Sequence, residues 1–416
     1  MSLFCSSSAS SIALAFLFVA TANAEPPPPQ TAPSQPDRKL ELTSKDGAQR
    51  LRLGGQLQVD ALTFPGDSSG QNTDDIRLRR ARLDVRSQVA NDYRLRMQLD
   101  FANSNLQIVD AYLELAHLEE IRLRIGKGKS PVSVDRGQSA TNMHFLERGA
   151  TNQTAPNRDL SVQVLGKIGG GLIDYQLGMF AGAPDGATSI ESNADDRFDL
   201  VGRLTFQPLP GLEVGATWSY GIARGTSDAP QLGGGYRTSG RATWFRYRAG
   251  DELADTVVAA GERVRMGGHL LWHFGPLGVF GEVISSTQEL ALGGERMAAT
   301  HLGWVGQVVV EVTGEDASFD GVTPNLGVSA GGPGAIELAL RVHGIEIDDE
   351  VFTRGFADPE RQAGSYLAFT FGATWYFDSQ FKLQLNYERS TFSGGAADGL
   401  DRSTENLLGV RLQHLF

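Results

Sequence analysis

Arginine is the residue type in this sequence whose abundance and spacing could do chemistry. The chain has 37 Lys and Arg residues, and only six of them are Lys. A guanidinium is always charged, is weakly hydrated and offers a planar fork of donors to oxyanions. The densest group is "IRLRRARLDVR" at residues 76–86. A row of such side chains along a water-filled passage would lower the barrier for phosphate-like anions.

Many of these arginines occupy the polar positions of segments that alternate between polar and apolar residues. At Arg79 and Arg80 the apolar residues change parity, which predicts a β-bulge that aims both guanidinium groups at the passage. Parity adds further candidates for the same pathway, namely Arg82, Arg94, Arg96, Arg122, Arg124, Arg203 and Arg341. The alternative is that such arginines pair with inward Asp and Glu residues and only brace the wall.

Other chemistries find little support. The seven His residues occur singly or in a pair, and the spacing of His269 and His273 does not bring two metal ligands together on a strand. There is no GxSxG motif, and "GKGKSP" at 126–131 lacks the spacing of a phosphate-binding P-loop. The one Cys, Cys5, lies in a segment expected to be removed. We therefore expect no catalytic residue, metal or cofactor.

The elements that carry the arginines read as strands. "YRLRMQLDF" at 93–101, "EIRLRIG" at 120–126 and "FKLQLNYE" at 381–388 alternate with a period of two over about the length that a tilted strand needs to cross a bilayer. A composition with 41% hydrophobic residues is too polar for a protein of many membrane helices. It suits a membrane barrel, because only every second strand residue faces lipid.

The predicted connections alternate between tight and long. Tight ones fall near 90–91, 117–119, 169–170, 208–211, 275–276 and 378–379, and long ones near 64–75, 130–157, 183–195, 223–261, 288–298, 348–362 and 392–403. The exception is 313–333, a long segment on the side where turns should be short. About sixteen segments result, which predicts an all-β fold, a transmembrane up-and-down antiparallel β-barrel. A soluble β-solenoid or adhesin would not produce this alternation.

The two ends of the chain are also informative. Residues 1–24 have an apolar core and a small-x-small site at 22–24, which predicts a secretory signal peptide, and 25–48 read as a Pro-rich leader before a barrel at 49–416. The last residues, "LLGVRLQHLF", alternate to the end of the chain. A closed barrel must pair its last strand with its first, so we expect Phe416 to help close the barrel at an aromatic girdle.

At "RRARLDV", "FLERG", "GWVGQVVVEVTGED" and the Phe-terminated last strand, the chain resembles the phosphate- and polyphosphate-selective porins of Gram-negative outer membranes. The resemblance runs from about residue 51 to 416. It implies a homotrimeric barrel in the outer membrane, inserted by the barrel-assembly machinery through the C-terminal strand. It also implies a ladder of Arg and Lys that conducts small anions such as phosphate and polyphosphate, and no nucleic-acid partner.

The resemblance further implies an inward-folded third long loop at 130–157. Arg136, Glu147 and Arg148 match its constriction region, with Asp135 and Glu147 as supports, and Arg79 and Arg80 match paired arginines of the second strand. A long inward-folding segment would account for 313–333. Two departures keep a general diffusion pore open as an alternative: Gln56 stands where phosphate-selective members carry a basic residue, and 313–333 has no Lys or Arg. A barrel-anchored enzyme or adhesin is the second alternative.

Overall fold

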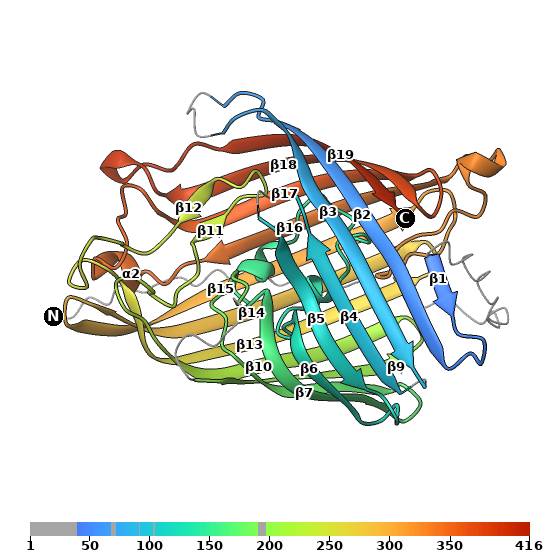
Figure 1. Cartoon of the computed structure of the whole chain (residues 1–416). Helices are drawn as coiled ribbons and strands as arrows, with labels where there is room; N and C mark the ends of the chain where they lie inside the picture. The colour runs from blue at the N-terminus through green and yellow to red at the C-terminus, as the bar shows by residue number, and fades with distance from the viewer. Residues whose placement is uncertain (1–39, 68–71, 91, 103–104, 190–196) are drawn as a thin grey trace. The chain divides into compact units, whose positions relative to one another are not determined.

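The strands form a closed antiparallel barrel (Figure 1). The computed structural model describes residues 40–67, 72–90, 92–102, 105–189 and 197–416. Sixteen strands make the barrel. They are β2 (Gln49–Thr63), β3 (Asp75–Val89), β4 (Tyr93–Asp100), β5 (Gln107–Leu115), β6 (Arg122–Lys129), β7 (Arg158–Ile168), β8 (Ile173–Phe180), β9 (Asp199–Leu209), β10 (Leu212–Arg224), β13 (Val258–Phe274), β14 (Leu277–Leu292), β15 (Glu295–Glu311), β16 (Ala335–Glu346), β17 (Ala363–Tyr376), β18 (Phe381–Gly394) and β19 (Glu405–Leu415). The predicted fold class is confirmed.

The remaining elements are short. β1 (Leu40–Thr43) pairs with the start of β2, and β11 (Tyr236–Arg237) with β12 (Thr243–Phe245) forms a hairpin between β10 and β13. The helices are α1 (Val134–Gly137), η1 (Ala150–Gln153), η2 (Val328–Ala330), α2 (Glu350–Thr353) and η3 (Ala397–Gly399). In the described part of the chain, no helix has the length and apolar character to cross a membrane. The expected signal peptide and most of the expected leader lie outside the described residues.

The barrel closes where β19 pairs with β2, with Leu412 opposite Val59. At the end of this seam the C=O of Phe416 accepts from the N–H of Gly55 at 2.8 Å, and the N–H of Phe416 donates back at 3.2 Å. A Cβ at Gly55 would lie 2.2 Å from Cζ of Phe416, so only glycine leaves room for the terminal ring. The predicted pairing of the last strand with the first is confirmed.

The outside of the barrel is apolar and its inside is polar. On β2, Leu57 and Val59 are exposed while Gln58 and Asp60 are buried. Exposed aromatic residues mark two levels, Tyr220 (register partner Val264 of β13) and Phe274 at the other end of β13. Ten residues separate Val264 from Phe274, which is about 24 Å along the membrane normal for a strand tilted by about 45°. This height matches the apolar band of a membrane barrel.

One predicted connection is wrong. The expected long loop at 288–298 does not exist, because β14 and β15 continue to Leu292 and Glu295 and are joined by only Gly293 and Gly294. Both glycines have positive φ, 56° and 96°, as a two-residue hairpin turn requires. The predicted long segment on the short-turn side is confirmed at 312–334, between β15 and β16.

The predicted bulge on β3 is confirmed. Gln58 of β2 faces Arg80, but the next residue, Val59, faces Leu78, so Arg79 is the extra residue. The apolar residues therefore change parity at this point without leaving the outer face. Both arginines reach the barrel interior, where Arg79 bonds to Glu147 and Arg80 to Gln58.

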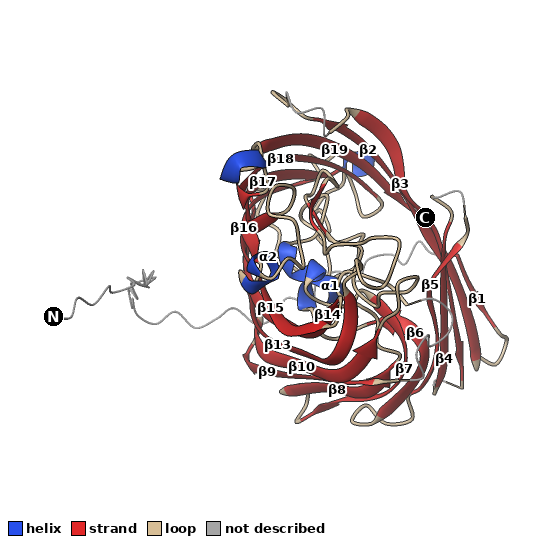
Figure 2. Cartoon of the chain, turned by 90° about the vertical axis from the view of Figure 1, so that its left-hand side faces the viewer, coloured by secondary structure: helices blue, strands red, loops and turns tan. Residues whose placement is uncertain are grey.

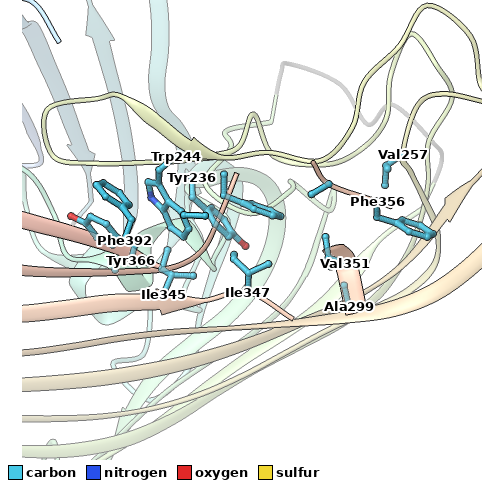
Figure 3. Close-up of a cluster of buried hydrophobic side chains, with 14 of the residues drawn as sticks. Tyr236, Trp244, Val257, Ala299, Ile345, Ile347, Val351, Phe356, Tyr366 and Phe392 are labelled. Carbon is cyan, nitrogen blue, oxygen red and sulfur yellow. The ribbon is translucent and has the colours of Figure 1, made fainter. Parts of the chain in front are cut away.

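An aromatic core occupies one side of the barrel mouth on the long-loop rim (Figure 3). We call it the mouth cluster: Tyr236, Trp244 and Phe245 of the β11–β12 hairpin, packed against the inward-facing Ile345, Tyr366 and Phe392 of β16, β17 and β18. The rings of Trp244 and Tyr366 stack with centroids 5.4 Å apart, and Trp244 has no exposed surface. The hairpin therefore fills the mouth next to β16–β18, and its turn reaches the β2–β3 side, where Ser239 shares a small pocket with Arg77.

Candidate functional site

The segment 130–157 between β6 and β7 crosses the barrel interior, with α1 inside the ring of strands (Figure 2). We call it the constriction loop. On β14, Glu282 accepts hydrogen bonds from Oγ of Ser133 at 2.9 Å and from the N–H of Val134 at 2.5 Å. Because Glu282 faces inward, this contact fixes the start of α1 inside the barrel. The predicted position of an inward-folded loop agrees with these contacts.

Farther along, inward-facing side chains of the wall hold the constriction loop by its main-chain carbonyls. The donors come from β2, β16, β18 and β19. They are Gln58 to Ala140 (3.0 Å), Gln413 to Thr141 (3.0 Å), Lys382 and Gln384 to Met143 (3.1 and 2.8 Å), Arg411 to Leu146 (2.6 Å) and Arg341 to Glu147 (2.7 Å). In a trans peptide the N–H points opposite to the C=O. The N–H groups of His144, Glu147 and Arg148 therefore point away from this wall.

Glu147 of the constriction loop binds the bulged arginine of β3. Its carboxylate accepts from Nε and Nη2 of Arg79 at 2.6 and 2.9 Å. Although burial raises the pKa of Glu147, the charge and hydrogen bonds of Arg79, with the charges of Arg80 and Arg411, lower this pKa well below its usual range. Glu147 therefore stays ionised and links the loop to the wall.

Three buried or half-buried cations at the constriction have only neutral acceptors. Arg80 donates to the side-chain amide oxygen of Gln58 at 2.6 Å, Lys129 to the carbonyls of 137 and 138 at 2.9 and 2.8 Å, and Arg136 to a carbonyl at 3.3 Å. None of them forms an ion pair within the described ranges. Burial lowers the pKa of Arg136, and the charges of Arg148 and Arg158 lower it further. Among the described residues, none of the three has a carboxylate within ion-pair distance, although Glu147 acts on Arg80 and Asp110 on Lys129 from farther away.

On the wall beside the constriction, carboxylates are shared between arginines. Three acids serve six guanidinium groups: Asp84 binds Arg86 and Arg96, Asp110 binds Arg96 and Arg158, and Glu114 binds Arg94, Arg122 and Arg124, at 2.6–3.4 Å. We call these six arginines, with Arg82 bound to Asp100 at 2.7 Å, the arginine wall. The wall thus contains the ion pairs that the bracing hypothesis predicts and, in addition, more guanidinium groups than carboxylates.

The structure brings most of the predicted pathway residues to this region. Arg79, Arg80, Arg82, Arg94, Arg96, Arg122 and Arg124 lie on β3, β4 and β6, and Arg136, Arg148, Asp135 and Glu147 lie in the constriction loop. The side chain of Arg94 is 46% exposed and that of Arg124 23%, so the interior is accessible to solvent there. Asp135 accepts from the N–H of Gly149 at 2.8 Å and from Asn152, which folds the loop back on itself.

Two predicted residues lie on other strands but also reach the constriction loop. Arg203, on β9, is 3.9 Å from Asp174, and its Nη1 would lie 3.9 Å from a Cβ at Gly137 of the loop. Arg341 lies on β16, across the barrel from the arginine wall, and its guanidinium binds the constriction loop and Glu388, at 3.2 Å. Its contacts are those of an anchor for the loop.

Sequence reasoning missed several residues of the site. Lys129 and Arg158 flank the constriction loop, and Lys382 and Arg411 hold it from the far wall. The signal that could have found Lys382 and Arg411 is their place on the polar parity of two late strands, next to Gln384 and Gln413.

The segment 312–334 supports the constriction loop from the short-turn side. Nε2 of Gln138 donates to the carbonyl of Phe319 at 3.1 Å, and Nδ2 of Asn142 donates to the carbonyl of Asp320 at 2.5 Å. Both of these contacts use neutral groups. Across the described ranges, no cluster of three or more His, Cys, Asp or Glu residues is arranged to hold a metal ion.

Trp244→Ala is expected to loosen the β11–β12 hairpin and raise the channel conductance. The substitution removes a fully buried ring, which costs about 3–5 kcal/mol of packing. Limited proteolysis of the folded barrel should then cut the hairpin faster than in wild type, and single-channel recordings should show larger currents. Trp218→Ala, on the outer face, is the control. An uncut hairpin and an unchanged current in Trp244→Ala would contradict the role of the mouth cluster in closing this side.

The model of a family described as phosphate-selective porin O and P matches residues 51–416. The outer membrane channel DcaP of Acinetobacter baumannii has a similar structure, with a TM-score of 0.56 and 14% identity over 90% of this chain and 99% of that one. OmpT of Vibrio cholerae gives 0.55 and 11% over 91% and 100%, and OmpF of Salmonella typhi, in complex with daunomycin, gives 0.53 and 12% over 91% and 100%. A search of curated protein sequences gave no match.

Proposed function

Because this chain belongs to the phosphate-selective porin O and P family and is thus an outer-membrane channel of a Gram-negative bacterium, we propose that it conducts small anions between the constriction loop and the arginine wall. The solutes are small and hydrophilic and diffuse passively, and no covalent step is involved. Oxyanions such as phosphate and polyphosphate are the preferred class, because guanidinium forks match their oxygens.

The observation that carries this proposal is a set of three cations at the constriction that form no direct ion pair with a described residue. Arg80, Lys129 and Arg136 bind only neutral acceptors. The chain as a whole has a formal charge of −12, but much of the acid lies in outer loops such as 347–362. Pore selectivity depends on the charges that line the passage locally, and these three cations add positive charge beside the constriction loop.

The N–H groups of the constriction loop add to this environment. Those of His144, Glu147 and Arg148 point away from the wall that binds their neighbouring carbonyls. Each N–H carries a partial positive charge, and a row of them favours an anion in the same way as a backbone nest. We therefore infer that the loop contributes main-chain donors opposite the guanidinium groups.

A general diffusion pore is the second candidate, and one observation favours it. Gln56 of β2, a neutral residue, lies opposite Arg82 in the sheet, and the segment 312–334 has no Lys or Arg to concentrate phosphate. Such a pore would pass anions and cations with similar ease and would not be blocked by phosphate.

Reversal potentials in planar bilayers test the proposal. In a KCl gradient the wild-type channel is expected to prefer chloride over potassium, and added phosphate should reduce the chloride current in a saturable way. A cation preference would overturn the anion pathway. Anion preference without phosphate block would support a general anion pore and would contradict a preference for oxyanions.

Export, assembly and oligomeric state are also matters of proposal. We propose that residues 1–24 are removed during export, that 25–48 form an extended leader, and that three copies assemble through their outer faces. We further propose that Phe416, at the end of the barrel seam, is the residue by which the barrel-assembly machinery recognises the last strand. Crosslinking of the purified protein would count the copies.

A further inference from the structure

A groove lies on the outer face of the barrel at the long-loop rim. Its volume is about 620 Å³, and its lining comes from the ends of β10, β13, β14 and β15 and from the loop before β13. Small residues form the floor, Ala260, Ala291 and the Gly293–Gly294 turn, and Leu253 and Leu292 add larger apolar surface. The volume equals that of about 20 water molecules at roughly 30 Å³ each, which is enough for a large polar headgroup.

Two arginines from different strands converge on this floor. Arg224 of β10 is the register partner of Ala260, and Nη1 of Arg296 of β15 donates to the carbonyl of the same Ala260 at 3.3 Å. Both side chains are exposed and line the groove. The side chain of Arg224 makes no hydrogen bond or ion pair within the described ranges, so its guanidinium donors are free for a ligand.

The height of the groove can be read from the strands. On the outer face of β10, Tyr220 marks the upper edge of the apolar band, and Arg224 follows four residues farther along the strand. Four residues of a strand tilted by about 45° rise by roughly 10 Å. Polar headgroups occupy the region just outside the hydrocarbon core. The two guanidinium groups therefore lie at headgroup level.

We propose that this groove binds the phosphorylated headgroup of a lipid of the outer leaflet. The arginine pair supplies forked donors to a phosphate monoester, and the small and apolar residues accept the body of the headgroup. Glu262 and Glu289 lie one step nearer to the membrane, and each accepts a hydrogen bond from the protein: Tyr220 donates to Glu262 at 3.0 Å, and the N–H of Glu262 donates to Glu289 at 3.2 Å. The groups of the groove that remain free to bind a ligand are thus the guanidinium donors of its two arginines.

Native mass spectrometry of the purified full-length channel tests this assignment, with a bisphosphorylated glycolipid as the probe and its dephosphorylated form as the comparison. A chelator in the buffer removes bridging divalent cations. Wild type is expected to bind the phosphorylated lipid at least tenfold more tightly than the dephosphorylated one. The variant with Arg224→Gln and Arg296→Gln should lose this difference. The matched control with Arg246→Gln and Arg361→Gln, which removes the same charge from exposed sites outside the groove, should keep it.

Equal binding of both lipids by wild type, or an unchanged preference in the groove variant, would overturn the proposal. Complete displacement of the lipid by millimolar inorganic phosphate would identify the occupant as free phosphate and would also overturn it. Because both arginines lie on the outer face, the groove variant should keep the wild-type reversal potential. Failure of lipid binding and failure of the anion pathway are therefore separate results.

Discussion

Replacing Arg80, Lys129 and Arg136 together by Gln is expected to lower the anion-over-cation permeability ratio at least tenfold. The side chains of these cations donate only to neutral acceptors, so their removal breaks no direct ion pair in the described part of the chain and subtracts positive charge from the constriction. A unit charge 4 Å from an ion contributes about 1 kcal/mol in water and more in a less polar site, and 1.4 kcal/mol is a factor of ten. Reversal potentials in a KCl gradient measure the ratio directly.

The control variant carries Lys45→Gln, Arg246→Gln and Arg361→Gln. It also loses two arginines and one lysine, but from exposed positions, so the two triple variants have the same net charge. Its selectivity should remain that of wild type. If both variants shifted the reversal potential equally, selectivity would follow the global charge, and the three cations of the constriction that form no direct ion pair would have no special role.

The barrel itself could be predicted from sequence because alternation and turn chemistry are local properties. In "YRLRMQLDF" and "FKLQLNYE", nine residues or fewer are enough to distinguish the apolar face of the strand from its polar face. The change of parity at Arg79 likewise predicts the bulge that the register contains. The one wrong connection has a local cause as well. The alternation continues through 288–298, and the Gly293–Gly294 pair is typical of a two-residue hairpin turn. These residues therefore favour a continuous hairpin and not the expected long loop.

The site could be predicted only in part, because charge pairing in a barrel depends on strands that are distant in sequence. Parity placed Arg96 and Arg124 inside, yet it could not show that Arg96 shares Asp84 and Asp110 with other arginines. Parity also placed Arg341 inside, where the barrel's curvature sets it against the constriction loop, far from the arginine wall. Such partners follow from barrel closure and loop path, which no local pattern contains.

Arg411→Met is expected to destabilise the barrel by about 3–5 kcal/mol, because removing one member of a buried ion pair leaves the buried Asp60 with only a longer contact to Arg77, at 3.9 Å. Arg411 of β19 has no exposed side-chain surface and binds Asp60 of β2 through two hydrogen bonds, at 2.7 and 2.8 Å. The two residues are register partners at the seam that closes the barrel. Denaturant unfolding in detergent micelles, followed by the loss of the folded band in unheated gels, measures the change.

A second substitution separates this cause from a general loss of packing. Adding Asp60→Leu to Arg411→Met removes both charges of the pair, and replacing a buried pair by apolar residues is usually neutral or stabilising, so most of the lost stability should return. Arg77 then loses its 3.9 Å contact to Asp60, but its side chain is 19% exposed and keeps contact with solvent. Arg86→Met, whose side chain is 51% exposed beside Asp84, should cost less than about 1 kcal/mol. In the rescued double variant the carbonyl of Leu146 still lacks its donor, so the constriction loop is held less firmly. The barrel should therefore be stable, but the single-channel current should fluctuate more than in wild type. A double variant as unstable as Arg411→Met alone would show that the seam depends on the shape of this pair and not on its charge.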